Sequence, residues 1–260
     1  MARAVSVLTI AGSDSGGGAG IQADLKTFAA HGLHGLTAIA ALTAQNTRGV
    51  QAIHVPPPTF LQAQLHSVFT DFDIRAVKIG MLANARIIDV VADALEKHRP
   101  KHVVLDPVMV SSSGHALLEP RAIRRLVERL FPMASVLTPN IDEAALLLGH
   151  DIGDDDQAEG ALVELLAMGT KAVLLKGGHL SGNKIIDRLD TGKALYEFEH
   201  PRLKVSGHGT GCTLASAITA NLALGKPLPD ACAAAGEYVF KALKGAYSPG
   251  KGGLSVLKHL

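Results

Sequence analysis

Short apolar runs alternate along the chain with longer segments in which apolar residues recur every three or four positions. The short runs predict buried strands at residues 5–11, 36–44, 76–79, 103–105, 135–137 and 172–175. The longer segments predict helices at residues 21–30, 59–69, 87–98, 123–130, 143–148, 158–168, 214–224 and 230–244. Strands that alternate with helices predict a three-layer α/β/α sandwich around a mostly parallel sheet. No linker-like stretch divides the pattern, so residues 1–260 are expected to form a single domain.

Two further runs, residues 185–190 and 194–200, are separated by Thr191, Gly192 and Lys193. This spacing predicts a β-hairpin. Polar and glycine residues surround it, as they do in many active-site lids. The segment from His179 to His200 is therefore expected to act as a small flap that is mobile without ligand and ordered with it.

Polar residues follow the predicted strands at the point where each one ends. They are Asp14, Gln45, Asp106, Asn140 and Lys176. The carboxyl ends of parallel strands meet at one edge of a sheet, and that edge carries the ligand site in open α/β folds. We therefore expect these side chains to lie together around a ligand.

The glycine-rich segment 207–214, GHGTGCTL, runs directly into an uncharged apolar stretch that ends at Gly225. One interpretation is a tight turn that lets a buried helix pack closely. The other is an anion site, because the first amides of a helix are unpaired and lie at its positively polarised end. The polar residues at the strand ends favour the second interpretation, a phosphate site.

Composition and charge limit the classes of function. Apolar residues make up 47% of the chain and aromatic residues 4%, with no Trp, so the core must consist of Ala, Val, Leu and Ile. The formal charge is +1, from 25 basic and 24 acidic residues, which gives nucleic-acid binding no electrostatic support. The two cysteines, Cys212 and Cys232, are too few for a disulfide framework. No signal-peptide pattern and no membrane-length apolar run are present, so a cytoplasmic protein without membrane partners is expected.

Two familiar phosphate-binding motifs are absent. The nearest match to a P-loop is residues 245–251, but Gly252 follows where Ser or Thr is needed for Mg²⁺, and no strand precedes it. The glycine-rich turns also do not fit a dinucleotide-binding motif.

Seven ordered motifs carry a resemblance to a known family. They are residues 11–24 (AGSDSGGGAGIQAD), 42–47 (LTAQNT), 78–82 (KIGML), 105–109 (LDPVM), 138–144 (TPNIDEA), 176–179 (KGGH) and 208–214 (HGTGCTL). In these motifs the chain resembles the hydroxymethylpyrimidine and hydroxymethylpyrimidine-phosphate kinases of thiamin biosynthesis, which belong to the ribokinase-like superfamily. The resemblance covers most of the chain. It implies a ribokinase-like fold and an enzyme that uses ATP and Mg²⁺. Phosphate would be transferred first to the hydroxymethyl group of the aminopyrimidine, which is an alcohol, and then to the resulting monophosphate.

The resemblance also implies roles for individual residues. Gln45 would form hydrogen bonds with the polar edge of the pyrimidine ring, since a side-chain amide offers both a donor and an acceptor. The residues that would line the pyrimidine pocket are Gly12, Ala19, Met81 and Val108. Each of these residues, taken alone, also has a structural explanation, such as a loop cap for Gln45 or core packing for Met81.

The phosphate end of the site would be formed by charged residues and backbone amides. Asp106, Asn140 and Glu143 would order Mg²⁺ and phosphate, with the two carboxylates as candidate metal ligands, and Lys176 would neutralise the ATP phosphates. The amides that would stabilise the transferring group belong to Gly209, Thr210, Gly211 and Cys212. Cys212 stands where most sugar kinases of the superfamily have a catalytic Asp. The helix-terminal amides are expected to lower its pKa below the free value of about 8.5.

Several points stay open at this level. The run from Lys204 to His208 lacks the Asn-Thr that usually precedes this His in the family, and residues 250–254 depart from its usual Gly-Lys-Gly-x-Gly-Pro pattern. A pyridoxal kinase with the same Cys is one alternative function, and a non-catalytic pyrimidine sensor is another. The resemblance also implies a homodimer.

Overall fold

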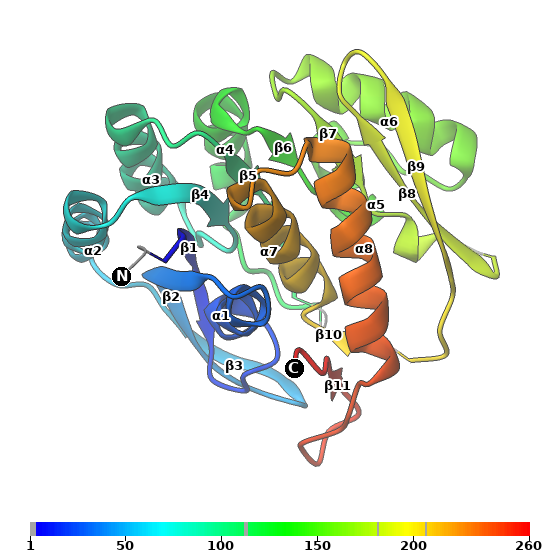
Figure 1. The fold of residues 1–260 in the computed structure, drawn as a ribbon, viewed down its shortest axis with the longest axis horizontal. Coiled ribbons are helices and arrows are strands. Elements are labelled where there is room, and N and C mark those ends of the chain that lie inside the picture. The colour runs from blue at the N-terminus through cyan, green and yellow to red at the C-terminus, as the bar shows by residue number, and fades with distance from the viewer. Residues whose placement is uncertain (1–3, 112–113, 181, 206) are drawn as a thin grey trace.

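A computed structural model describes residues 4–111, 114–180, 182–205 and 207–260. Its centre is a nine-stranded sheet in the order β3-β2-β1-β4-β5-β6-β7-β8-β9. The strands are β1 (Ser6–Asp14), β2 (His34–Asn46), β3 (Gly49–His54), β4 (Ile74–Ile79), β5 (Val103–Leu105), β6 (Val136–Leu137), β7 (Val173–Leu175), β8 (Lys184–Asp190) and β9 (Leu195–Pro201). Figure 1 shows the sheet running through the molecule between two layers of helices.

The six central strands, from β2 to β7 in the sheet order, are parallel to their neighbours. Antiparallel pairing occurs at the edges only, where β3 joins β2 and where β8 and β9 follow β7. The predicted mostly parallel sheet is therefore confirmed. Because the six strands share a direction, the residues that follow them lie along one edge.

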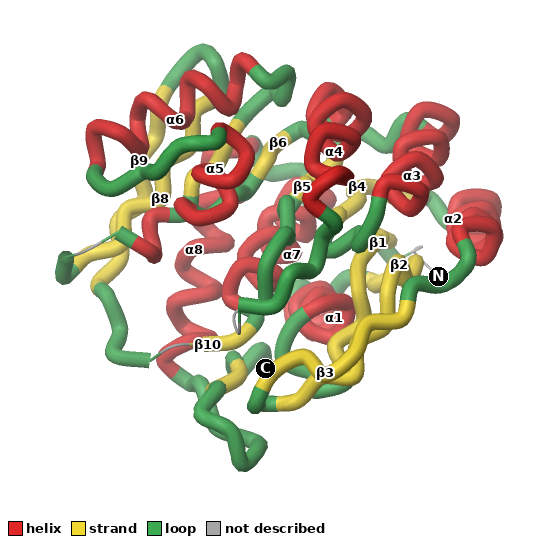
Figure 2. The backbone as a smooth tube through the Cα atoms, turned by 180° about the vertical axis from the view of Figure 1, so that it is seen from behind, coloured by secondary structure: helices red, strands yellow, loops and turns green. Residues whose placement is uncertain are grey.

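Helices cover both faces of the sheet, as the alternating pattern predicts. They are α1 (Gly20–Ala30), α2 (Pro58–Asp71), α3 (Ala85–His98), α4 (Ile123–Leu130), α5 (Ile141–Leu148), α6 (Asp155–Ala167), α7 (Thr210–Ala223) and α8 (Leu228–Lys244). α1, α7 and α8 lie on the face seen in Figure 1, and α2 to α6 lie on the face seen in Figure 2. The three-layer sandwich is confirmed.

The side chains of β5 show how the sheet divides the core into two parts. Successive residues of a strand point to opposite faces. Val103 and Leu105 belong to the apolar cluster under α2 to α6, whereas Val104 belongs to the cluster under α7 and α8. All three are buried, which explains why the strand appears in the sequence as a continuous apolar run.

The predicted hairpin is present as β8 and β9, and its two strands continue the central sheet at one edge. Arg202, just after β9, donates hydrogen bonds to the carbonyls of Gly178, Leu180 and Gly182 at 2.8, 2.5 and 2.8 Å. These bonds tie the loop after β7 to the end of the hairpin. Ser181 lies outside the described residues, and movement of the flap on ligand binding stays a prediction.

The C-terminal segment adds a small second sheet that the sequence pattern did not predict. β10 (Gly207–His208) pairs in parallel with β11 (Ser255–Val256). Between α8 and β11 the chain reaches the β2–β3 turn, where the amide of Gly252 donates to Thr47 Oγ1 at 2.9 Å. Residues 250–254, where the chain departs from the family pattern, thus lie beside the β2–β3 turn, and Gly207 and His208 pair with the residues that follow them. Ser206 lies outside the described residues.

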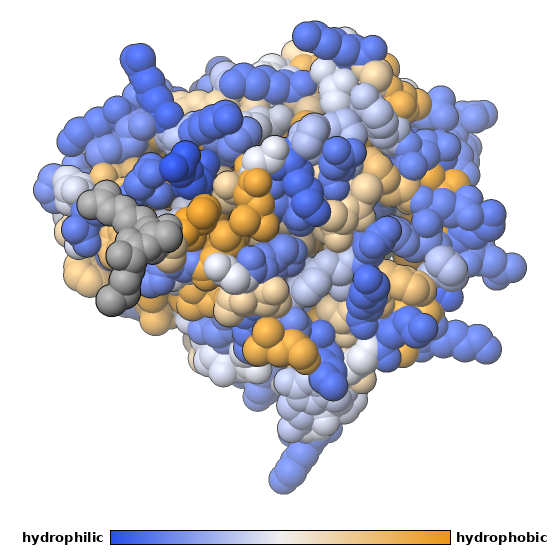
Figure 3. Space-filling view, in the orientation of Figure 1, coloured by the Kyte–Doolittle hydropathy of each residue, from blue (hydrophilic) through white to orange (hydrophobic). Residues whose placement is uncertain are grey.

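The outer surface of the α7–α8 layer is mixed in character. Figure 3 shows polar residues over much of this face, with apolar patches between them. Within the described ranges, none of the helices has both the length and the apolar content needed to cross a membrane.

Candidate active site

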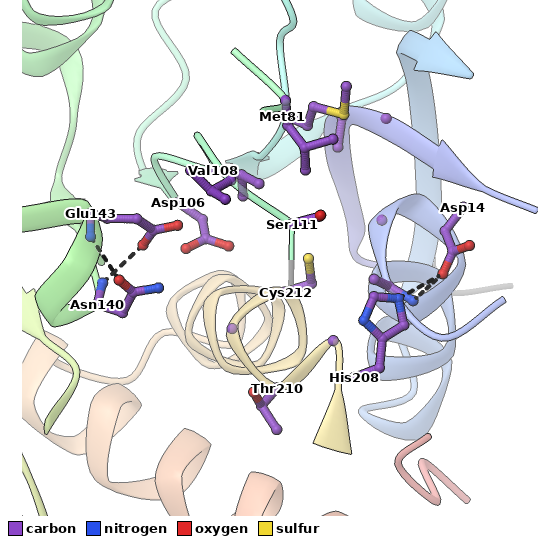
Figure 4. Close-up of a pocket in the computed structure, with 18 of the residues that line it drawn as sticks. Asp14, Met81, Asp106, Val108, Ser111, Asn140, Glu143, His208, Thr210 and Cys212 are labelled. Carbon is purple, nitrogen blue, oxygen red and sulfur yellow. Dashed lines mark hydrogen bonds and ion pairs between the residues drawn. The ribbon is translucent and has the colours of Figure 1, made fainter. Parts of the chain in front are cut away.

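A cavity of about 570 Å³ opens at the carboxyl ends of the parallel strands. It brings together every residue that the sequence analysis assigned to a site. These are Gly12, Ala19, Gln45, Met81, Asp106, Val108, Asn140, Glu143, Lys176, Gly209, Thr210, Gly211 and Cys212. In Figure 4, Cys212 lies between an acidic group at Asp106 and Glu143 and the pair formed by Asp14 and His208.

The acidic group is built around one lysine. Lys176 Nζ lies 2.9 Å from Asp106 Oδ1 and 3.6 Å from Glu143 Oε2. Thr138 Oγ1 donates to the same Asp106 oxygen at 3.2 Å. Burial lowers the pKa of Lys176, but the two carboxylates outweigh burial and raise it, so the lysine stays charged.

Glu143 is fixed by the start of α5. Asn140 Oδ1 accepts from the Glu143 amide at 2.8 Å, and Glu143 Oε2 accepts from the Asn140 amide at 2.9 Å, which completes a capping box. Burial raises the pKa of Glu143 to about 7, helped by Asp106 and opposed by Lys176. A cation bound beside Glu143 would therefore favour the charged form of its carboxyl group.

The anion site is the N-terminus of α7. Gly209 is the N-cap residue with φ 83°, and the first intrahelical bond runs from the Thr213 amide to the Gly209 carbonyl at 2.9 Å. The three preceding helix amides, those of Thr210, Gly211 and Cys212, are therefore outside the intrahelical pattern and belong to the helix end that lines the cavity. A Cβ built on Gly211 would lie 3.1 Å from Lys176 Nζ. The amides and the lysine thus face one small volume, which suits a phosphoryl group.

The expectation of a lowered pKa at Cys212 is wrong. Burial raises the pKa of the thiol to about 11, with Asp24 and Asp106 acting in the same direction. Lys78 and an amide hydrogen bond from Gly20 oppose this shift but do not outweigh it. Cys212 is therefore a neutral thiol at neutral pH in the free protein and holds no thiolate to act as a base.

For the two acceptors that the family resemblance implies, the hydroxymethyl group of the aminopyrimidine and its monophosphate, we expect Cys212→Ala to slow phosphorylation by the same factor, within about threefold. A base is needed mainly for the alcohol, since a phosphate monoester has its second pKa near about 6 and is already ionised. A neutral thiol helps neither acceptor in this way. The measurement is kcat/KM for both acceptors in wild type and variant. A loss at least tenfold larger for the alcohol would show that Cys212 acts as a general base.

The loop that follows β1 is organised by Asp14. Its carboxylate accepts from the amides of Gly16, Gly18 and Ala19 at 2.7, 3.0 and 2.9 Å. Burial raises the pKa of Asp14, but the hydrogen bonds from His208, Ala19 and Gly16 outweigh burial and lower it. The charged Asp14 thus holds Ala19, the N-cap of α1, in the cavity wall.

The opposite wall is apolar and carries one amide. Met81 is 7% exposed, and a Cβ built on Gly12 would lie 3.0 Å from its Sδ. Val108 and Met81 lie together above Cys212 in Figure 4. Gln45, at the end of β2, brings an amide to this wall. An apolar wall that carries one amide suits a small ring with a polar edge.

The structure adds residues that the sequence analysis left out of the site. Lys78 is fully buried and lines the cavity floor, with its Nζ 3.0 Å from Asp24 Oδ2. Asp24 also accepts from Thr9 Oγ1 at 2.6 Å and from Ser216 Oγ at 2.7 Å. The sequence feature that could have identified Lys78 is its position as the one charged residue in the predicted strand 76–79. Thr43 and His208 also line the cavity, and His208 precedes the glycines of the anion site.

The donor set at Asp106 and Glu143 fits a magnesium ion that is shared with a substrate. No cluster of three or more His, Cys, Asp or Glu side chains suited to a metal occurs in residues 4–111, 114–180, 182–205 and 207–260. Mg²⁺ commonly takes one or two carboxylates and completes its coordination with water and phosphate oxygens. The pair of carboxylates is enough for that mode of binding, in the presence of nucleotide.

In metal-free buffer, we expect the free energy of unfolding of the wild type to fall relative to that of Glu143→Gln as pH rises. A folded pKa of about 7, above the ordinary value of 4.5 for a glutamate, favours folding below pH 4.5, and this benefit is lost between pH 4.5 and 7. The change should approach ~3 kcal/mol. Urea unfolding at several pH values measures it, with the exposed Glu159→Gln in α6 as control. Parallel pH profiles for wild type and Glu143→Gln would contradict the raised pKa.

Comparison with known proteins gives a consistent family assignment. A family model described as phosphomethylpyrimidine kinase matches residues 14–257. The chain is 48% identical over 241 residues to the hydroxymethylpyrimidine/phosphomethylpyrimidine kinase of Rhizobium meliloti, covering 92% of the chain and 90% of that protein. It is 49% identical over 248 residues to the thiamine biosynthesis bifunctional protein of Geobacter sulfurreducens, covering 95% of the chain and 51% of that protein. The chain therefore spans about half the length of this second relative.

Two solved structures resemble the fold closely. The ADP complex of Bacillus subtilis pyridoxal kinase superposes with a TM-score of 0.92 at 35% identity, covering 99% of this chain and 98% of that one. The phosphomethylpyrimidine kinase of Clostridium difficile superposes with a TM-score of 0.82 at 44% identity, covering 92% of this chain and 99% of that one. The backbone is thus close to both kinds of kinase.

Proposed function

Because the chain belongs to the phosphomethylpyrimidine kinase family, we propose that it transfers phosphate from ATP to 4-amino-5-hydroxymethyl-2-methylpyrimidine and then to the monophosphate, in thiamin biosynthesis. The observation that carries the proposal is the single cavity in which the α7 terminus, Lys176 and the Asp106–Glu143 pair face an apolar wall with one amide, Gln45. The test is ADP release with the aminopyrimidine, its monophosphate and pyridoxal as acceptors. We expect both pyrimidines to be used, and ADP release with pyridoxal alone would contradict the proposal.

The chemistry follows from where the charges lie. The oxygen of the acceptor attacks the γ-phosphorus, the bond from that phosphorus to the β-phosphate oxygen breaks, and ADP leaves. Lys176 and the amides of residues 210–212 stabilise the negative charge on the transferring group. The transition state is loose, so the alcohol keeps its proton until late and passes it to a phosphate oxygen or to water. No step needs a thiolate at Cys212.

Asp106 and Glu143 would hold Mg²⁺ through carboxylate oxygens, with Asn140 fixing Glu143. When bound, the ion supplies charge neutralisation at the β- and γ-phosphates. Lys176 would contact the nucleotide phosphates from its present position, because its Nζ lies between Asp106 and the α7 terminus.

A second candidate function is pyridoxal phosphorylation, which the close superposition on the Bacillus subtilis pyridoxal kinase favours. The higher identity to the phosphomethylpyrimidine kinases favours the pyrimidine. A non-catalytic sensor would have no use for Lys176 and the acidic pair at an anion site, and the acceptor assay described above separates it from both kinases.

Gln45→Ala should raise KM for the aminopyrimidine far more than it lowers kcat. Loss of the amide leaves the polar edge of a bound ring without a partner, which costs about 1–3 kcal/mol, or roughly 5- to 150-fold in KM. Steady-state kinetics at saturating ATP measures it. Gln51→Ala, on the exposed strand β3, is the control. An unchanged KM would remove Gln45 from the substrate site.

Two properties of the whole protein are also part of the proposal. The family resemblance supports a homodimer, and the sheet ends in strands β3 and β9, which have one unpaired edge each in the described fold. ATP as the phosphate donor and two free cysteines, Cys212 and Cys232, support a cytoplasmic location.

A further inference from the structure

The amide of Gln45 lies in a small hydrogen-bond network with Thr43 and His208. Gln45 Nε2 lies 3.0 Å from His208 Nε2, and Thr43 Oγ1 lies 3.1 Å from Gln45 Oε1. His208 Nε2 also lies 3.2 Å from Asp14 Oδ2, and Thr43 Oγ1 lies 3.0 Å from the Ser13 carbonyl. The network joins the ends of β1 and β2 to the residue before the anion site.

With Gln45 Nε2 facing His208 and Oε1 facing Thr43, the hydrogen-bond donors and acceptors of the network cannot all be paired. Charged Asp14 only accepts, so His208 Nε2 must carry a hydrogen to bond it, and that hydrogen then faces an N–H of Gln45. The hydroxyl of Thr43 has one hydrogen but faces two acceptors, Gln45 Oε1 and the Ser13 carbonyl. Two of the four contacts are therefore left without a proper donor and acceptor.

A half-turn of the amide removes both conflicts. The amide oxygen then takes the place 3.0 Å from His208 Nε2 and accepts the hydrogen that His208 shares between Gln45 and Asp14. The amide nitrogen takes the place 3.1 Å from Thr43 Oγ1 and donates to it, while Thr43 gives its only hydrogen to Ser13. The oxygen and nitrogen of an amide are assigned from such networks, and this arrangement satisfies every member.

His208 cannot easily move to release the amide. Its β10 backbone pairs with β11, opposite Val256. A Cβ built on Gly18 would lie 2.7 Å from His208 Cδ2 and 2.8 Å from Val256 Cγ1, so the ring is packed against the backbone of the Asp14 loop. The His208 side chain is 11% exposed. Because the ring is held, the amide is held in one orientation.

We infer that His208 and Thr43 are positioning residues that fix the direction of the Gln45 amide, and thereby select ligand rings by the order of donor and acceptor along one edge. This inference rests on the proposed function, in which Gln45 reads the ring. An aminopyrimidine presents an exocyclic N–H donor beside a ring-nitrogen acceptor. A 4-oxopyrimidine presents the reverse order at the same positions, a carbonyl acceptor beside a ring N–H donor. A freely turning amide would accept both orders, whereas a fixed amide accepts one.

A pair of ligands with the same ring tests the inference directly. The first is 4-amino-5-hydroxymethyl-2-methylpyrimidine, and the second is its 4-oxo analogue, which presents a carbonyl acceptor beside a ring N–H donor. Dissociation constants of both are measured by calorimetry without ATP, so that the chemical step and the anion site do not contribute. The wild type should prefer the amino ligand by at least about 100-fold, since the reversed edge places donor against donor and acceptor against acceptor.

His208→Leu and Thr43→Val each remove one of the two groups that hold the amide. We expect the ratio of the two dissociation constants to fall at least about tenfold in each variant, because the amide can then turn to fit the 4-oxo ligand. Thr43→Ser keeps the hydroxyl and should keep the wild-type ratio. Thr43→Val changes the shape of β2 very little, so it keeps the test available where His208→Leu fails to fold.

The outcomes separate this inference from the proposed function. A ratio that stays at the wild-type value in both His208→Leu and Thr43→Val would overturn the inference, because equal losses for the two ligands mean that these residues only support the shape of the site. A wild-type protein that does not bind the aminopyrimidine at all would overturn the proposed function, and the inference with it.

Discussion

Replacing Lys176 with Met is expected to lower kcat/KM by about 10³-fold for both the alcohol and the monophosphate, at saturating ATP. The side chain is 13% exposed and its Nζ lies within 3.6 Å of two carboxylates. The same ammonium would lie 3.1 Å from a Cβ at Gly211, beside the first amides of α7. It is therefore the cation in a position to serve both the acidic pair and the transferring phosphoryl group.

The size of the effect follows from the surroundings of the charge. In an enzyme site that stabilises developing negative charge, removing one such group costs about 10²–10³-fold in kcat. Loss of Lys176 also removes one of the positive charges that neutralise Asp106 and Glu143 beside the nucleotide phosphates. The two effects act on the same step, so we expect the upper end of the range. The KM for ATP should rise as well.

Two controls separate chemistry from folding. Lys171→Met removes an exposed lysine just before β7 and should leave the kinetics unchanged. The double variant Lys176→Met with Glu143→Gln removes one unpaired carboxylate, so it should recover thermal stability without recovering activity. A Lys176→Met protein that is folded and retains more than a tenth of wild-type kcat/KM would contradict the role of Lys176.

Much of the fold follows from local patterns in the chain. Buried parallel strands such as β5 and β7 are short apolar runs, and the uncharged stretch before Gly225 forms α7, as predicted. The parallel sheet then brings polar residues from distant strands to one edge. Asp106 and Lys176 are 70 residues apart in the chain and 2.9 Å apart in space. The shared direction of the strands was enough to predict this grouping.

Other features depend on contacts that no local pattern contains. β3 is missing from the predicted strands because most of its side chains are at least partly exposed, so it has no apolar run. The predicted strand 36–44 continues to Asn46 as β2 and pairs with β3. The β10–β11 pair joins segments almost 50 residues apart, with only two residues in each strand. The network of Thr43, Gln45 and His208 could not be predicted from the sequence, because His208 is 163 residues from Gln45 in the chain.

The pKa of Cys212 also depends on contacts that the neighbouring sequence does not contain. A cysteine in the first turn of a helix predicts a lowered pKa from the helix terminus alone. In the fold, burial and the carboxylates of Asp24 and Asp106 raise it to about 11. Asp24 comes from α1 and Asp106 follows β5, so their effect could not be read from the α7 motif.

Gly209→Ala is expected to abolish most of the activity and to destabilise the protein. Gly209 has φ 83°, which L side chains rarely adopt, and a Cβ there would lie 2.0 Å from the carbonyl oxygen of Gly18. The variant must therefore push the α7 terminus away from the Asp14 loop, by a shift of the backbone on at least one side. Displaced amides no longer meet the transferring group, so kcat should fall by at least about 10²-fold.

Gly225→Ala provides a matched control for the backbone strain. Gly225, after the other end of α7, has φ 90° but nothing within 4 Å of a built Cβ. It should lose about 1 kcal/mol of stability with kcat unchanged, because only the left-handed backbone is strained. Chemical unfolding and kcat for both variants give the comparison. If Gly209→Ala lost no more kcat than Gly225→Ala, the close packing of α7 against the Asp14 loop would be irrelevant to the anion site.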